Sequence, residues 1–474
     1  INDLVSLAIP GFGPPIQNDI VRAQSLRGRD PQILIDGVPL DFNGGGGSGL
    51  SVFAKFDPEI ISRLEVLYGP NTVYGAGATG GVIQFFTKDA SEDPFELRVR
   101  QQFTTFPDAP DIYGDLALSS KTTLQASGTL SLFDYFLSYS FDSVNGVYDA
   151  EGDLNNPVFY GFEDEKTYFA KIGFYPTPEQ RLEGSFNFIE LIEDGRVFTS
   201  SITDDGRAIG QEDPNQTPFN YGSDNEPINE KEFYNLRYTH DNLFGGEFAA
   251  QVFGRSEDRI SSFIDLRANA ASPTWPTGWP DNYQSFFTDE GDGYRLQYSR
   301  AFADKVNELV GIDYQEQERS SEAIVYGLGA DFDETRDVSV APVRTDLFLF
   351  PFRVETTGYF LQADYEATPR LRFSAGVRQE DVEFEIGAGR RVFERTLDAT
   401  GAQVSRPGGF GSNNGTAFNV GVSYDAVDWL TVYGSFAQGF EIPALSVVAG
   451  QVPPDASLQG DDAVEPQIVD NYEI

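Results

Sequence analysis

The folding pattern is set early in the chain, where residues 26–40 read LRGRDPQILIDGVPL and residues 56–88 read FDPEIISRLEVLYGPNTVYGAGATGGVIQFFTK. The apolar runs in this stretch are short, and Asp-Gly, Gly-Pro and Gly-Gly pairs separate them. Such punctuation is typical of short strands joined by tight turns. We therefore predict a small compact unit with strands at 33–35, 64–67 and 82–86.

A second pattern begins near Phe95 and continues to the end of the sequence. Apolar and polar residues alternate through segments such as 124–132, 359–366, 370–378 and 418–424. Alternation with a period of two places apolar side chains on one face of a strand and polar ones on the other. Strands of about ten residues suit a tilted membrane crossing, and we predict about 14 of them.

The connections between these strands alternate between short and long. We expect tight turns at 133–134, 177–179, 367–369 and 425–428, and long polar loops at 147–165, 196–230, 260–290, 319–355 and 385–415. Short turns at one end of the strands and long loops at the other are typical of outer-membrane barrels. A soluble β-sandwich shows the same alternation within its strands, but it rarely carries so many long structureless loops.

The charge balance excludes one class of partner and leaves several others open. The chain has 33 basic and 74 acidic residues, for a net charge of −41. We expect no nucleic-acid binding, because phosphates require a basic face. Four explanations fit the excess of acidic residues. They could attract cations into a lumen, bind lipopolysaccharide through divalent ions, suit a saline habitat, or simply keep long loops solvated. The 22 Tyr and 40 Phe suit aromatic girdles at two membrane interfaces.

Catalysis is not expected from this sequence. His240 is the single histidine and there is no cysteine, which argues against zinc sites, thiolate sites and Ser-His-Asp triads. The glycine run at 44–49 lacks the Lys-Ser/Thr pair of a phosphate loop. The acidic segment 196–230 lacks EF-hand spacing, and we favour a solvated loop there over a calcium site. We predict no catalytic residue, no metal site and no cofactor.

The runs at 26–40, 63–70 and 74–88 also carry a family resemblance. In this order, directly before the alternating strands, they resemble the plug of TonB-dependent outer-membrane receptors, and 436–448 and 464–474 resemble barrel segments of that family. The resemblance implies an all-β transmembrane barrel enclosing a small mixed α/β plug domain, with the plug at 1–90 and the barrel at 91–474. Barrels of this family have about 22 strands, so we expect further strands after Ile474. We also expect more of the plug, with a TonB box, before Ile1.

The same resemblance implies a function. Receptors of this family lie in the bacterial outer membrane, in contact with lipid and lipopolysaccharide, and the TonB–ExbB–ExbD complex drives active uptake of a scarce ligand through them. The ligand implied is a ferric siderophore. Cobalamin, haem, a nickel complex or an oligosaccharide remain alternatives, as does a passive porin. Haem is less favoured because FEIP (440–443) lacks the arginine of the family's FRAP segment.

Two groups of residues are predicted to act at the plug. The resemblance implies that Arg27, in the LRG segment, locks the plug to the barrel, while Tyr68 occupies the position of the family's second lock arginine. Arg29 and Arg63 are further candidates for ion pairs with the barrel wall. Ligand contacts are predicted at Gln17, Asn18, Arg22 and Gln24 of the plug, and at Trp275 and Trp279, which form either an aromatic platform or a loop anchor.

A third group lies on the polar face of one predicted strand. Arg370, Arg372 and Arg378 share that face. In an open lumen they would attract an anionic ferric complex. Alternatively, they pair with acids of the neighbouring strand, such as Asp364 and Glu366. Both interpretations stay open at the level of sequence.

Overall fold

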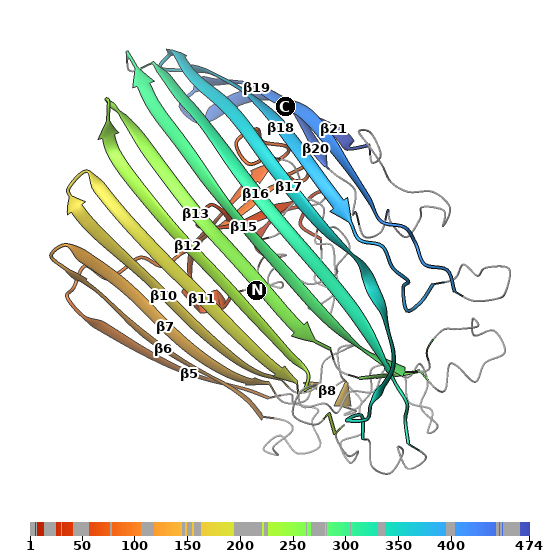
Figure 1. Cartoon of the computed structure of the whole chain (residues 1–474). Coiled ribbons are helices and arrows are strands. Elements are labelled where there is room, and N and C mark those ends of the chain that lie inside the picture. Colours follow the sequence, from red (N-terminus) through yellow and green to blue (C-terminus); the bar gives the residue numbers. More distant parts are fainter. Residues whose placement is uncertain are drawn as a thin grey trace.

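The computed structural model describes residues 5, 7–13, 25–29, 31–40, 56–75, 78–105, 118–144, 147–148, 154–155, 163–193, 220–221, 226–261, 263–266, 280, 282–303, 305–329, 337–394, 403–441, 445, 448 and 465–474. The fold is nearly all β, and a small plug domain lies in the hollow of one large curved sheet, the barrel sheet (Figure 1). The fold class predicted from the sequence is confirmed. Among the described residues, no helix has the length and apolar character needed to cross a membrane.

The plug domain is built on a four-stranded sheet in the order β2-β1-β4-β3. Its elements are β1 (Gln32–Ile35), β2 (Val38–Pro39), the short 3₁₀ helix η2 (Pro58–Ile60), β3 (Ile61–Tyr68) and β4 (Gly81–Thr87). Strand β1 runs parallel to β4 and antiparallel to β2. Asp36 and Gly37 join β1 to β2 with φ values of 46° and 82°, the left-handed values that an Asp-Gly hairpin turn requires. The strands predicted at 33–35, 64–67 and 82–86 are confirmed.

The barrel sheet is antiparallel throughout, and among the described strands β5 and β21 are its two ends. Its strands are β5 (Glu96–Thr105), β6 (Leu118–Leu130), β7 (Phe133–Val144), β10 (Glu163–Thr177), β11 (Gln180–Glu193), β12 (Ile228–Leu243), β13 (Gly246–Ile260), β15 (Asn282–Phe302), β16 (Val306–Tyr326), β17 (Pro342–Thr368), β18 (Leu371–Ile386), β19 (Gly409–Val427), β20 (Leu430–Glu441) and β21 (Gln467–Glu473). The short β14 (Ile264–Asp265) pairs with β15, and β8 (Val147–Tyr148) pairs with β9 (Leu154–Asn155). The predicted number of about 14 long strands agrees with this path.

Short turns gather at one end of the barrel sheet (Figure 1). They include 131–132, 178–179, 244–245, 369–370 and 428–429. At the other end the strands run further than the sequence predicted. The loop expected at 319–355 is wrong for most of its length, because β16 continues to Tyr326 and β17 already begins at Pro342.

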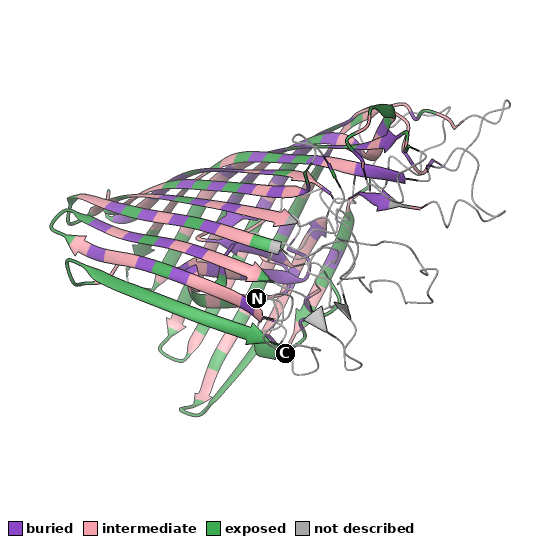
Figure 2. Ribbon diagram, turned by 90° about the horizontal axis from the view of Figure 1, so that it is seen from below, coloured by how far each residue is buried: buried purple, intermediate pink, exposed green. Residues whose placement is uncertain are grey.

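The convex face of the barrel sheet carries an apolar band. Val310, Leu361, Val377 and Phe418 are register neighbours on β16 to β19, and each is between 42% and 49% exposed. Alternate residues, such as the buried Phe360, face the concave side, which gives the strands their striped burial pattern (Figure 2). An exposed apolar band on the outside of such a sheet is the surface that lipid contact requires.

Beyond this band the convex face becomes acidic. Asp292, Glu316, Glu355 and Glu383 are register neighbours on β15 to β18. Like charges directly opposite one another destabilise a sheet. The guanidinium of Arg353 offsets part of this repulsion, since it lies 2.8 Å from Glu316 and 3.0 Å from Glu355.

The concave face changes in the opposite sense at the same level. Phe350, Phe352 and Val354 of β17 pack with Val382 and Phe384 of β18 in a buried cluster. From Phe350 to Val354, β17 keeps its period of two, but its apolar side chains lie on the concave face instead of the convex one. Further along, the pairing of β16 with β17 shifts register between Arg319 and Tyr326. The strands therefore have no single apolar face over their whole length, and the sequence pattern predicted a loop at 319–355 instead.

Replacing Leu361 by Arg tests whether the convex band faces lipid. A charge in the lipid-facing part of a barrel strand costs about 2–4 kcal/mol, so L361R should reduce the folded, heat-modifiable protein in the outer-membrane fraction. Glu383→Arg, on the same face beyond the band, is the matched control and should leave that amount unchanged. Equal losses from the two variants would contradict the assignment.

Candidate functional site: the plug–barrel interface

A row of mostly polar residues runs in register across the concave face of the barrel sheet. This concave row consists of Asp134, Gly173, Glu183, Arg237, Gln251, Arg295, Asp313, Gly358 and Glu380, one from each of nine adjacent strands. Arg181 lies beside the row and pairs with two of its acids, at 3.1 Å from Asp134 and 2.7 Å from Glu183. The wall that faces the plug domain is therefore polar and of mixed charge, as expected for a barrel lumen.

The glycines of the concave row make its ion pairs possible. A Cβ at Gly173 would overlap the carboxylate of Asp134, and a Cβ at Gly358 would overlap the guanidinium of Arg378. Each glycine thus leaves space for the charged side chain of a neighbouring strand.

The plug domain contacts this wall through the segment between β3 and β4. The hydroxyl of Thr72 donates a hydrogen bond to Asn419 Oδ1 at 2.6 Å. Next to it, the carbonyl oxygen of Val73 accepts a hydrogen bond from Arg295 Nη2 at 2.8 Å. This segment is therefore held by β15 and β19 through groups that water can also satisfy.

A second contact lies at η2, toward the β5 end of the barrel sheet. Asp57 is fully buried and caps η2 by accepting a hydrogen bond from the backbone N–H of Glu59 at 3.0 Å. Its carboxylate also lies 3.0 Å from Lys121 Nζ of β6. The carbonyl of Glu59 accepts a hydrogen bond from Gln125 Nε2 at 2.9 Å. One short helix thus joins the plug to the barrel by a buried ion pair and an amide contact.

A third contact joins the end of β4 to the barrel wall. Thr87 donates a hydrogen bond to the Asp36 carboxylate at 2.6 Å and accepts one from Lys171 Nζ at 3.2 Å. The same ammonium lies 3.1 Å from Asp89, and Gln251 Nε2 donates to the carbonyl of Asp36 at 3.1 Å. The Asp-Gly turn and the exit of the plug are therefore fixed by one lysine and one glutamine of the barrel.

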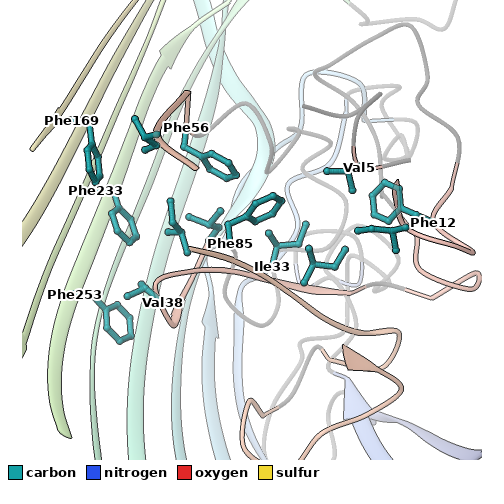
Figure 3. Close-up of a cluster of buried hydrophobic side chains, with 14 of the residues drawn as sticks. Val5, Phe12, Ile33, Val38, Phe56, Phe85, Phe169, Phe233 and Phe253 are labelled. Carbon is teal, nitrogen blue, oxygen red and sulfur yellow. The ribbon is translucent and has the colours of Figure 1, made fainter. Parts of the chain in front are cut away.

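Apolar side chains reinforce these polar contacts. Phe169, Phe233 and Phe253 project from the concave face of β10, β12 and β13 toward the plug, where Val38 and Phe56 belong to the same buried cluster (Figure 3). The sequence reasoning missed these phenylalanines, because each occupies a position on the otherwise polar face of its strand. A phenylalanine on the otherwise polar face of a barrel strand is the signal from which an internal partner could have been predicted.

Tyr74 of the plug shows the effect of this environment on a titratable group. Burial raises the pKa of its phenol, and the charge of Arg295 opposes the shift. The neutral hydroxyl donates a hydrogen bond to Gln84 Oε1 at 3.1 Å. Tyr74 therefore acts as an uncharged donor at physiological pH.

Arg27 makes the contact that the family resemblance suggested. Its Nη1 lies 3.2 Å from Glu473 Oε1 on β21, and its guanidinium lies over the ring of Tyr68 at 4.1 Å. Its backbone is left-handed, with φ of 54°, in a tight turn completed by Gly28. Tyr68, which replaces the family's second arginine, thus supports the first one. The role of Arg27 as a lock stays a prediction.

The other two predicted lock residues are differently placed. Arg29 is exposed, and its backbone pairs with Leu26 within the plug. Arg63 is exposed, lies 3.3 Å from Glu65 and stacks over Phe86 at 3.9 Å. The contacts that the structure describes for these two arginines are therefore within the plug domain.

The arginines of β18 form ion pairs, but not with the predicted partners. Arg372 lies 3.0 Å from Asp425 of β19, and Arg378 pairs with Asp313 and Glu380. Neither Asp364 nor Glu366 is among the ion-pair partners that the structure describes for these two arginines. Strand register selects Asp425 and Asp313, and the sequence does not reveal that register.

The predicted ligand contacts lie outside the described residues. These are Gln17, Asn18, Arg22, Gln24, Trp275 and Trp279, together with the glycine run at 44–49 and most of the acidic segment 196–230. Within the described ranges, no group of three His, Cys, Asp or Glu residues is placed to hold a metal ion.

Asp57→Ala tests the buried ion pair at η2. The change removes the cap of η2 and the closest carboxylate of Lys121, and breaking a buried pair costs about 3–5 kcal/mol. We expect the plug of D57A to become sensitive to protease at a lower denaturant concentration. Arg100→Gln, which breaks the solvent-exposed pair with Glu59, is the control and should change little, since exposed pairs contribute about 0–1 kcal/mol. Equal sensitivity of the two variants would refute the importance of the buried pair.

Comparison with known proteins identifies both parts of the chain. The family model for the TonB dependent receptor-like β-barrel matches residues 191–474, and the model for the TonB-dependent receptor plug domain matches residues 1–82. The rhizobactin receptor of Rhizobium meliloti (strain 1021) is 27% identical over 472 residues, covering 94% of this chain and 59% of that receptor. The ferric aerobactin receptor of Klebsiella pneumoniae is 23% identical over 501 residues, covering 100% of this chain and 65% of that receptor.

Solved structures share the fold. The unliganded ferric citrate transporter FecA matches with a TM-score of 0.67 at 15% identity, over 100% of this chain and 64% of its own. The ferric yersiniabactin uptake receptor FyuA of Yersinia pestis matches with a TM-score of 0.65 at 16% identity, over 99% of this chain and 66% of its own. This chain thus spans less than two thirds of the length of these relatives. On these matches, the chain belongs to the TonB-dependent receptors, β-barrel proteins of the bacterial outer membrane.

Proposed function

We propose that this chain is part of an active transporter that takes up a ferric siderophore through the outer membrane. The names of its relatives, receptors for rhizobactin and ferric aerobactin, support this class of ligand. The observation that carries the proposal is the position of the plug, which lies in the hollow of the barrel sheet and contacts its wall from β5 to β21. A lumen filled in this way excludes free diffusion and requires a step that moves the plug.

The nature of the contacts supports an energised mechanism. Hydrogen bonds such as Arg295 to Val73 and Thr72 to Asn419 exchange for bonds to water at a modest net free energy. A pull from TonB, energised by ExbB and ExbD, would therefore displace part of the plug without breaking the barrel. The ligand passes through without covalent change, so the protein needs no catalytic group and no cofactor of its own. The convex apolar band contacts lipid, and lipopolysaccharide surrounds its outer rim.

Ligand recognition in this proposal belongs to one segment of the plug and one long loop of the barrel. Gln17, Asn18, Arg22 and Gln24 contact the ferric complex from the plug, and Trp275 and Trp279 contact it from a long loop. Arg27, through Glu473, holds the plug in the resting state. The assignment of Arg27 follows from the family resemblance, and the ligand contacts follow from the sequence alone; all of them stay predictions.

Uptake of radioactive iron tests the transport proposal. A strain lacking this gene and the same strain carrying the full-length gene are given iron as ferric aerobactin or ferric rhizobactin, with and without a functional TonB. We expect uptake only when both the gene and TonB are present. Uptake that persists without TonB would favour a passive porin. If no ferric siderophore were taken up and cobalamin were transported, the proposed ligand would be wrong and cobalamin would take its place.

A further inference from the structure

We propose that two barrel arginines, Arg295 and Arg378, form a seat for the plug segment that contains Val73 and Gly75, and that this seat sets how tightly the resting channel is sealed. The proposal rests on the proposed function, in which the plug closes the lumen at rest and leaves it during transport. Both arginines reach inward from the wall. The plug meets them with a backbone carbonyl and a glycine.

Arg378 is held firmly by the barrel itself. Its Nη1 and Nη2 donate to the two carboxylate oxygens of Asp313 at 2.9 and 2.6 Å, and its Nε donates to Glu380 at 3.0 Å. Arg378 and Glu380 are each 1% exposed and Asp313 is 5% exposed. Bidentate, charge-assisted bonds of this kind fix both the position and the plane of a guanidinium group.

Gly75 fits against this plane because it has no side chain. Its φ is +88°, and a Cβ there would lie 2.8 Å from Arg378 Nη2, 3.0 Å from Cζ and 3.1 Å from Nε. On the other side, Gly358 leaves the space that the same guanidinium occupies. The group therefore lies between two glycines, one from the barrel and one from the plug. Since buried carboxylates hold Arg378, a side chain at position 75 must displace the plug segment instead.

Arg295 supplies the second half of the seat. Its Nη2 donates to the carbonyl oxygen of Val73 at 2.8 Å, and its guanidinium carbon lies 4.8 Å from the ring centre of Phe360 and 5.5 Å from that of Tyr74. Its Nε is buried and has no hydrogen-bond partner among the described residues. The Arg295 guanidinium therefore lies near two aromatic rings, and its hydrogen bond to the plug goes to a backbone carbonyl.

This chemistry suits a plug that must be released. An ion pair between plug and barrel leaves two uncompensated charges when it separates. When the seated segment leaves, Arg378 keeps both of its carboxylates, and the segment takes away a carbonyl, a glycine and the ring of Tyr74, none of which carries a charge. The seat is therefore selective for shape but opposes withdrawal with little electrostatic force.

Gly75→Ala and Arg295→Met test the seat in the full-length protein. The first adds the obstructing Cβ, and the second removes the donor to Val73 while keeping an unbranched side chain. We expect each to raise the ion conductance of the purified protein in planar bilayers about tenfold, which corresponds to about 1.4 kcal/mol in the balance between sealed and leaky states. Cells without TonB should become sensitive to vancomycin in parallel.

Gly245→Ala is the matched control. Gly245 lies in a short turn of the barrel sheet, away from the plug, with a similar left-handed backbone (φ +81°), and an added Cβ there would lie no closer than 3.9 Å to Arg300. It should seal like the unaltered protein, and heat-modifiable mobility verifies that every variant contains a folded barrel. Tight sealing by both test variants, or equal leakage of all three, would overturn the seat. Because leakage is measured without TonB or ligand, failure of siderophore uptake would contradict the proposed function and leave this result intact.

Discussion

Backbone N–H and C=O groups find no water in hydrocarbon, and this constraint shapes the rest of the molecule. The strands from β5 to β21 meet it by pairing with one another in a continuous antiparallel ladder. Once the ladder fixes the register, side chains must alternate between lipid and lumen, and residues far apart in sequence become neighbours. Arg295 beside Asp313 and Arg237 beside Gln251 are such neighbours. The polar wall is thus a consequence of the same pairing that makes the membrane crossing possible.

The plug is held by contacts of unequal strength. The pair of Arg27 with Glu473 has side chains that are 50% and 25% exposed, and solvent-exposed pairs contribute about 0–1 kcal/mol. Asp57 is fully buried beside Lys121, so loss of that pair removes the opposite charge closest to a carboxylate that water does not reach. Phe253 and its neighbours add contact area that depends only on shape (Figure 3). The ion pair of Arg27 with Glu473 is therefore the weaker of the two plug–barrel contacts, and the pair of Asp57 with Lys121 at η2 is the stronger.

The sequence predicted the parts of this architecture that local chemistry determines. The Asp36-Gly37 pair predicted a tight turn in the plug, and strict alternation predicted the strands of the barrel. It failed at 319–355, where the apolar side chains change face and the pairing of β16 with β17 shifts register. It also did not pair Arg378 with Asp313, because the register between β16 and β18 depends on the whole sheet. Phe169 and Phe233 were missed as well: a phenylalanine on the polar face indicates an internal partner, but the identity of that partner, here Val38 and Phe56 of the plug, depends on the fold.

The concave row crosses the wall obliquely. Asp134 lies beside a short turn, whereas Glu380 lies deep within β18. Gln251 and Arg295, the members of this row that bond to the plug, consequently lie at different depths along the lumen. A force applied to one end of the plug then breaks such contacts one after another. The peak force is therefore set by the strongest single contact rather than by the sum of all contacts. Because the strands are tilted, a tightly fitted plug can be displaced by a smaller force than simultaneous loss of all its contacts would require.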